Sequence, residues 1–369
     1  MGHRILALII KEFLALFRDK KSRMAVIVPP ILQLLIFGYA ATFDLENADL
    51  AILNEDSGVF SRELVGRFQG SAGFHLVGYL QSAAEIGPLI DRKGALLVLH
   101  IDSHCSAQVA QGEGCPVQVL IDGRNSNTAM LALNYVRSIV IDFNRQYAEQ
   151  VFGARLPAEL TLRAWFNPNL ESRWFIVPGI IALLAMIVTL VVTALSVARE
   201  REAGTFDQLL VTPLRPWEIL IGKAMPGLIV GVGEASLIIL VTVFWFRIPL
   251  VGSLATLYPA LVIYVLAIIG VGLMISSFST TLQQALLGAF LFIVPAVILS
   301  GFTTPIANMP PLMQRLTYLD PMRYFLIIVR RVFLEGAGLE YFWHELWPMS
   351  LIAVVTLTLA TWLFRHRMY

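Results

Sequence analysis

The sequence predicts an α-helical polytopic membrane protein with six transmembrane helices and an α/β extracytoplasmic domain inserted between helices 1 and 2. Hydrophobic residues make up 57% of the 369 positions and charged residues only 14%. The mean hydropathy is +0.72, far from the balance of a soluble domain. The net charge of +1 gives no electrostatic reason to expect nucleic acid as a partner.

The predicted spans are windows long enough to cross a bilayer. A helix needs about 20 apolar residues to cross the ~30 Å hydrocarbon layer. Six windows approach that length: 24–43, 174–198, 223–245, 254–278, 285–302 and 346–364. The fifth is the shortest and contains Pro295, which a helix bundle tolerates because neighbouring groups satisfy the freed backbone.

The orientation follows from the basic residues close to the spans. They gather before the first span, between the second and third, and after the sixth: Arg4, Lys11, Arg18, Lys20, Lys21 and Arg23; Arg199, Arg201, Arg215 and Lys223; Arg365, His366 and Arg367. Six spans put all three groups on one side. We therefore expect both termini in the cytoplasm and residues 44–173 on the far side.

Residues 1–23 predict a cytoplasmic amphipathic helix lying at the membrane interface. Apolar side chains share one helical face, and basic ones remain for the other: Ile5, Leu8, Ile9, Phe13 and Leu16 against Arg4, Lys11 and Arg18. A secretory signal peptide is the alternative, since 38–40 reads Gly-Tyr-Ala. The positive region is too long for one, and the chain downstream stays in the membrane.

The interval 44–173 alternates between strand-like and helix-like stretches, which indicates a compact α/β domain rather than a linker. The predicted strands are 50–53, 74–80, 95–101 and 117–121, and the predicted helices are 61–68, 82–91 and 127–150.

Both cysteines, Cys105 and Cys115, fall in this domain and are a candidate disulfide, because the far side of a bacterial inner membrane oxidises thiols. Two independently packed residues are the alternative. A metal site at His100, His104 and Cys105 lacks a second ligand pair at zinc-like spacing, so no metal is expected. The turn at 122–127 offers candidate helix N-caps at Asn125, Ser126 and Asn127.

Motifs for catalysis and for cofactor binding are missing from the sequence. It contains no phosphate-binding G-x-x-x-x-G-K-[ST] loop, no G-x-S-x-G and no H-E-x-x-H, so we expect neither a catalytic nor a cofactor-binding site. Glu234 is the one ionisable residue well inside a span, and Gln33 adds a polar group to span one. Such residues mark pathways by default, which makes both candidates for a pathway or gate. A hydrogen-bonded contact between helices is the alternative.

Residues 199–222 form a short charged segment held between two spans. Its acids are expected to be solvated, and it is well placed to receive a push from a soluble partner. Anchoring span two at the interface is the alternative.

Between spans five and six, prolines divide residues 303–345 into short helices, which we interpret as re-entrant or lying at the outer surface. An ordinary ordered loop is the alternative.

These features together resemble the permease subunits of bacterial type-2 ABC exporters, in the multidrug branch with a large external domain. The resemblance covers essentially the whole chain. It is carried by AREREAGTFDQLLVTPLRPWEILIGK after span two, SGFTTPIANMPPLMQRLTYLDPMRYF after span five, DGRNSN in the external domain and NPNLESRWFIVPG entering span two.

The resemblance implies a machine whose energy source is another polypeptide. Two permeases, identical or paralogous, would form the pathway with two separate ATPase subunits that hold ATP and magnesium, so this chain would carry no cofactor. The ATPase-coupling residues would be Arg199, Glu200, Arg201, Glu202, Gly204, Thr205, Asp207 and Gln208. The expected location is the bacterial inner membrane, among lipids. A lipophilic drug or lipid-like cargo and a periplasmic adaptor are further expectations.

Two other classes of function remain open. A proton-coupled secondary transporter using Glu234 is disfavoured by the lack of an internal repeat or an acid network. A membrane-anchored sensor or scaffold would act through the external domain.

Overall fold

The computed structural model describes residues 2–18, 24, 28, 30–36, 47–153, 165–168, 171–206 and 215–366. The chain divides into two compact units. Unit 1 comprises Met1–Thr42 and Ala164–Tyr369, and unit 2 comprises Phe43–Arg163.

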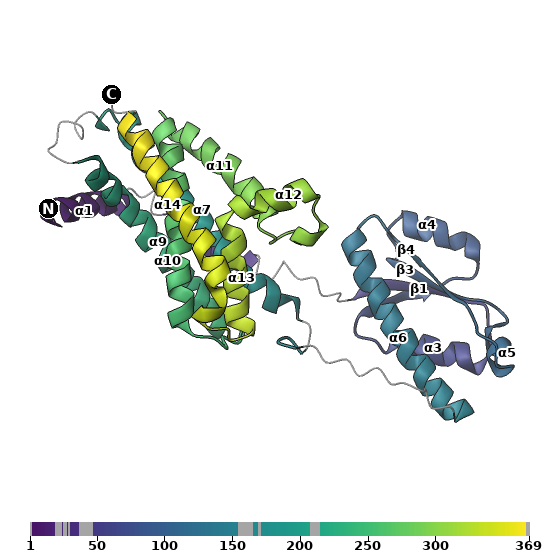
Figure 1. The fold of residues 1–369 in the computed structure, drawn as a ribbon. Helices are drawn as coiled ribbons and strands as arrows, with labels where there is room; N and C mark the ends of the chain where they lie inside the picture. Colours follow the sequence, from purple (N-terminus) through teal and green to yellow (C-terminus); the bar gives the residue numbers. More distant parts are fainter. Residues whose placement is uncertain are drawn as a thin grey trace. The chain divides into compact units, whose positions relative to one another are not determined.

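Unit 1 is built from helices (Figure 1). Its long helices are α1 (Gly2–Arg18), α7 (Ser172–Glu202), α9 (Pro216–Phe244), α10 (Leu254–Phe278), α11 (Leu282–Leu299), α13 (Pro321–Leu334) and α14 (Trp343–His366). In both overall views, α1 and the end of α14 lie at the same end of the bundle.

Within the described part of the chain, five helices are long and apolar enough to cross a membrane: Ser172–Glu202, Trp217–Phe244, Leu254–Phe278, Leu282–Leu299 and Leu339–His366. They correspond to the second to sixth predicted spans, so a helical membrane protein is confirmed. The first predicted span, 24–43, lies outside the described residues except for 24, 28 and 30–36. The number six therefore stays a prediction.

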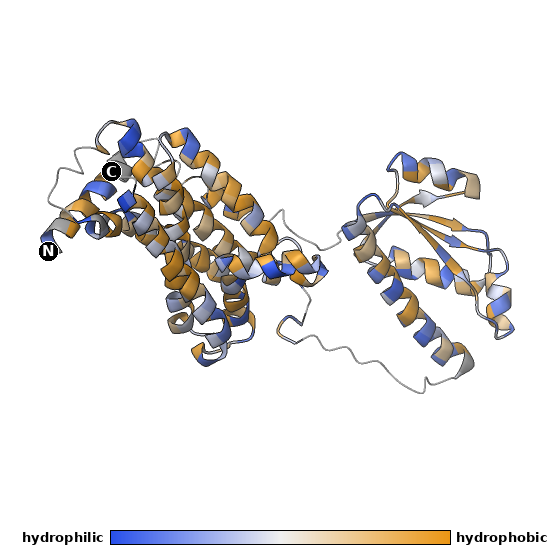
Figure 2. Ribbon diagram, turned by 45° about the horizontal axis from the view of Figure 1, so that its top comes forward, coloured by the Kyte–Doolittle hydropathy of each residue, from blue (hydrophilic) through white to orange (hydrophobic). Residues whose placement is uncertain are grey.

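Helix α7 lies in the middle of the bundle. It packs against α9, α10, α11 and α13, and 83% of its most apolar window is buried. The corresponding share is 33% for α9 and 17% for α11 and α14. Apolar residues run along the bundle helices, and hydrophilic ones gather near their ends (Figure 2). A helix that is apolar all round is expected to be enclosed by protein or lipid.

Small residues allow these helices to approach closely. A Cβ on Gly227 would lie 2.4 Å from Thr193 Cγ2, and one on Gly231 would lie 2.1 Å from Thr189 Oγ1. Both pairs join α9 to α7. Because hydrocarbon gives apolar side chains no reason to leave lipid, such close packing is what holds membrane helices together.

The segment between α11 and α14 consists of short helices, as its prolines predict. They are η2 (Ile306–Asn308), α12 (Pro311–Leu316), η3 (Thr317–Leu319), α13 and η4 (Leu339–Phe342). Helix α13 begins with the carboxylate of Asp320 accepting from the Met322 N–H at 2.9 Å. Its apolar face is buried among α7, α10 and α14, so this helix belongs to the core of unit 1.

In unit 2, four described strands form one sheet in the order β2-β1-β3-β4. They are β1 (Ala48–Asn54), β2 (Phe74–Tyr79), β3 (Leu97–Ile101) and β4 (Val117–Ile121). Strand β1 is parallel to both β2 and β3, whereas β4 is antiparallel to β3. The strands follow the predicted ranges closely, and β4 matches its range.

Helices cover both faces of this sheet (Figure 1). On one face lie α3 (Val59–Gln69), α5 (Cys105–Ala110) and α6 (Ser126–Phe152), and on the other lies α4 (Ile86–Asp91). The side chains alternate accordingly: Leu50 and Ile52 enter the first core, and Ala51 and Leu53 the second. The predicted helix 82–91 is divided into η1 (Ala83–Glu85) and α4, and α5 was not predicted.

Candidate functional site

The predicted coupling segment begins at the last turn of α7. Gly204 adopts the left-handed conformation with φ +68°, and the Thr205 N–H donates to the Glu200 carbonyl at 3.0 Å. A glycine in this conformation is a common way to end a helix, because an added Cβ is disfavoured there. The chain therefore turns sharply away from α7 immediately after Glu202.

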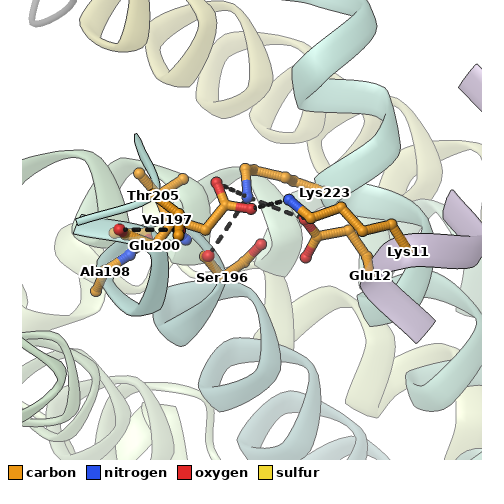
Figure 3. A network of polar contacts seen from close by, with 9 residues as sticks. Lys11, Glu12, Ser196, Val197, Ala198, Glu200, Thr205 and Lys223 are labelled. Carbon is orange, nitrogen blue, oxygen red and sulfur yellow. Dashed lines mark hydrogen bonds and ion pairs between the residues drawn. The ribbon is translucent and has the colours of Figure 1, made fainter. Parts of the chain in front are cut away.

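Four charged side chains from three helices meet beside this turn (Figure 3). We call Lys11, Glu12, Glu200 and Lys223 the ion cluster. The Lys223 ammonium lies 3.1 Å from Glu12 Oε1 and 2.9 Å from Glu200 Oε2, and Lys11 Nζ lies 2.6 Å from Glu200 Oε1. The two positive and two negative charges balance, and they join α1, α7 and α9.

The ion cluster is largely removed from water. The Lys223 side chain is 0% exposed and those of both glutamates are 10% exposed, whereas the Lys11 side chain is 51% exposed. Burial raises the pKa of the Glu12 carboxyl, and the neighbouring Lys223 only partly offsets that effect. Removing one member of a buried ion pair typically costs about 3–5 kcal/mol. Moving α1, α7 and α9 apart at the ion cluster would therefore break buried ion pairs and cost several kcal/mol.

Two other charged residues of the segment, Arg201 and Glu202, connect α7 to the turn between α10 and α11. Arg201 donates to the carbonyls of Ser277 and Ser279 at 2.9 and 3.1 Å. The exposed Glu202 accepts from the Leu282 N–H at 2.7 Å, the first turn of α11. A displacement of the α7 end is therefore passed to both α10 and α11.

The expectation that the acids of this segment are solvated is wrong for Glu200, which is only 7% exposed. Its partners explain the difference. The ammonium groups of Lys11 and Lys223 neutralise the Glu200 carboxylate, which water would otherwise have to solvate. Arg199, Arg201 and Thr205 are half-buried, and the exposed stretch is Glu202–Gly204. Asp207 and Gln208 lie outside the described residues.

Glu12 and Lys223 were not predicted as site residues, although the sequence contains a signal for each. Glu12 follows Leu8 by one helical turn and so falls on the apolar face of α1. Lys223 lies inside an apolar run. Opposite charges placed on two apolar faces indicate a buried pair, but the sequence gives no way to match the partners.

Glu234 lies in α9, away from the ion cluster. Among the described residues, neither of its carboxylate oxygens has a hydrogen-bond partner, and both are shielded from solvent. Gln33, in the short described stretch 30–36, is half-buried.

In unit 2, Cys105 and Cys115 form a disulfide with a Cα–Cα distance of 5.1 Å. Among the described residues, no three His, Cys, Asp or Glu side chains lie close enough together to hold a metal ion. The 122–127 turn has structural contacts: Asn125 accepts from the Thr128 N–H as the N-cap of α6, and Arg124 donates to the Ile90 carbonyl. Hydrogen bonds from Arg124 hold the pKa of the half-buried Asp122 at about 2.

Comparison with known proteins gives one consistent answer. The family model described as "ABC-2 family transporter protein" matches residues 20–362. The chain is 42% identical over 369 residues to "Probable multidrug ABC transporter permease YbhR" of Escherichia coli (strain K12), covering 100% of both chains. It is 32% identical over 349 residues to "Probable multidrug ABC transporter permease YbhS" of the same organism, covering 90% of this chain and 89% of the relative. "Inner membrane transport permease YhhJ" of that strain is 26% identical over 360 residues, with 96% and 95% covered.

Proposed function

Since the chain belongs to the ABC-2 family of transporter proteins, we propose that it is the membrane permease subunit of an ATP-driven exporter. Members of this family are transport subunits, not ATPases, and they work with ABC ATPase subunits. The ATP and magnesium would be held by separate ATPase chains. A second permease, identical or paralogous, would complete the pathway.

We propose six spans in the bacterial inner membrane, both termini in the cytoplasm and residues 44–173 outside. The positive residues near the spans support this orientation. The Cys105–Cys115 disulfide in unit 2 supports it independently, since the external side oxidises thiols. Single cysteines replacing the exposed Ser57 and Ala203 test it. A membrane-impermeant maleimide added outside should label Ser57→Cys in spheroplasts and Ala203→Cys only after lysis; the reverse pattern would reject the topology.

The observation that carries the coupling proposal is the set of contacts around the end of α7. The exposed Glu202–Gly204 turn offers a surface to a soluble partner. Directly behind it, Glu200 is bound to α1 and α9, and Arg201 and Glu202 are bound to the α10–α11 turn. A push on the turn would therefore move several spans together, as a rigid-body change between two states.

The cargo we propose is a lipophilic drug or a lipid-like compound. The names of two relatives contain the word multidrug. An apolar groove of about 300 Å³ between α10 and α11 also suits a lipophilic compound. It is lined by Val271, Met274, Ile275, Phe278, Gly288, Leu291 and Phe292.

Copurification of the ATPase tests the coupling surface, with variants chosen to spare the ion cluster. Glu202→Gln keeps an acceptor for the Leu282 N–H, whereas Glu202→Arg reverses the charge at the exposed turn. We expect Glu202→Arg to reduce ATPase recovery at least fivefold and Glu202→Gln to reduce it less. Glu340→Arg, at an exposed residue of η4, is the matched control. Full recovery with Glu202→Arg would favour the interface-anchor interpretation.

A further inference from the structure

Glu234 lies halfway along the part of α9 that crosses the bilayer. It lies eleven positions after Lys223 of the ion cluster and ten positions before Phe244 at the helix end. At 1.5 Å per residue, these stretches are about 16 Å and about 15 Å long. Together they match the ~30 Å hydrocarbon layer, which puts the carboxylate near its midplane.

The carboxylate is enclosed by protein yet lacks a partner among the described residues. Both its oxygens and the hydroxyl of Thr189 on α7 are buried without a hydrogen bond. Thr189 lies against Gly231, one turn before Glu234 on α9. By contrast, Ser236 donates to the Val232 carbonyl at 2.7 Å and accepts from Tyr258 at 2.8 Å. Gly231 and Glu234 are three positions apart and so share one face of α9, the face that carries the contact with Thr189.

The membrane-spanning windows have no positive charge to offer there, and Arg330 of α13 lies beside Gly179, ten positions and about 15 Å before Thr189 on α7. Windows 24–43, 174–198, 254–278, 285–302 and 346–364 contain no lysine, arginine or histidine, and neither does 224–244. Lys223, at the edge of its span, is already held by Glu12 and Glu200. An identical second copy has the same spans and would also bring no cation. An ionised carboxylate at the midplane is costly unless it is paired, so the ionised form of Glu234 is favoured when a ligand brings the opposite charge.

We propose that Glu234 is the recognition site for the positively charged nitrogen of lipophilic cations that this permease carries. This inference rests on the exporter function proposed above. It narrows the cargo to amphiphiles with an ammonium or similar cationic centre, the apolar part of which contacts the surrounding helices. An uncharged lipophile of the same shape gains nothing from the carboxylate.

The packing of α9 allows such a ligand to reach the site. Only 33% of the apolar window of α9 is buried, so one side of the helix holds most of its contacts. Those contacts include the glycine–threonine pairs with α7. A local opening beside Glu234, with Lys223 and Glu200 still joining the start of α9 to the end of α7, would expose both Glu234 and Thr189.

Two probes that differ only in charge test the inference. One is a dansyl-labelled alkyl trimethylammonium, and the other is its uncharged tert-butyl isostere. Saturable binding is measured on the full-length chain in phosphatidylcholine nanodiscs, with empty nanodiscs subtracted. We expect the wild type to bind the cation at least tenfold more tightly than the isostere. Glu234→Gln should weaken binding of the cation at least tenfold and change binding of the isostere less than twofold.

Two further variants make the result specific. Glu234→Asp retains the charge and should keep part of the preference for the cation. Glu340→Gln removes one exposed carboxylate that precedes the predicted span 346–364 and should change neither affinity. Equal weakening of both probes by Glu234→Gln, or no weakening of either, overturns the proposal.

A transport arm separates this site from the exporter function. Proteoliposomes containing the permease and its ATPase are given each probe with ATP. Selective loss of cation transport in Glu234→Gln supports the recognition site. Unchanged cation transport in that variant refutes it while leaving the exporter intact, and absence of ATP-driven transport of either probe by the wild type refutes the exporter itself.

Discussion

The sharpest structural prediction concerns Lys223→Met. This substitution keeps a long side chain in place but removes the ammonium that lies 3.1 Å from Glu12 and 2.9 Å from Glu200. It leaves two carboxylates, each 10% exposed, and among the described residues the half-exposed Lys11 is the cation that stays beside them. Breaking a buried ion pair in this way costs about 3–5 kcal/mol.

The assay is thermal unfolding of the purified protein in detergent, followed by tryptophan fluorescence. At roughly 2–4 °C per kcal/mol for a unit of this size, the Tm should fall by roughly 6–20 °C. Lys93→Met, at an exposed lysine of unit 2, is the control and should leave the Tm within about 2 °C.

A combined variant distinguishes charge imbalance from a simple loss of packing. Glu12→Gln, Glu200→Gln and Lys223→Met together remove the buried charges, so much of the lost stability should return. The reasoning about the ion cluster would be refuted if Lys223→Met alone changed the Tm by less than 2 °C, or if the combined variant were less stable than Lys223→Met.

Three further predictions follow from individual contacts. Gly231→Val should separate α9 from α7, because its Cβ would lie 2.1 Å from Thr189 Oγ1; we expect a lower Tm, and Gly233→Val, where no atom lies within 4 Å of an added Cβ, is the control. Burial raises the pKa of Asp320 to about 7. Between about pH 4 and 7, the Asp320 carboxyl is ionised in the unfolded chain but still protonated in the folded chain. The free energy of unfolding should therefore fall as the pH rises through that range. Asp320→Asn keeps an N-cap acceptor, and its Tm should exceed that of the wild type above pH 7 but not below pH 4; a constant difference would contradict this. Cys105→Ser with Cys115→Ser opens a loop of sequence separation 10 and should cost unit 2 about 2–3 kcal/mol, measured by proteolysis of the intact chain; unchanged resistance would count against the estimate.

Long apolar runs and the alternation of strand-like and helix-like stretches were sufficient to predict most helices and strands. The predicted span 254–278 coincides with α10, and the predicted strand 117–121 coincides with β4. Helix α11 begins at Leu282, three residues before the predicted window, because Thr281 caps it and the glutamines of its first turn lower the local hydropathy. Helix α5 escaped prediction because its six residues are too few to show a helical period.

The candidate site could be predicted only in part. The charged run after span two and the lone Glu234 are visible in the sequence, because each interrupts an apolar pattern. The burial of Glu200 is not, since its partner Lys11 lies 189 positions away and no local pattern reports such pairing. The same holds for Glu202, whose bond to Leu282 spans 80 positions.

ATP-dependent uptake into inside-out proteoliposomes tests the central claim most directly. Vesicles contain this permease alone or with its ATPase partner, and a fluorescent lipophilic probe is followed with ATP or with a pH gradient. We predict uptake only when the ATPase and ATP are both present, because the chain has no phosphate-binding loop. Uptake by the permease alone on a pH gradient, abolished by Glu234→Gln, would show instead that the chain is a proton-coupled transporter.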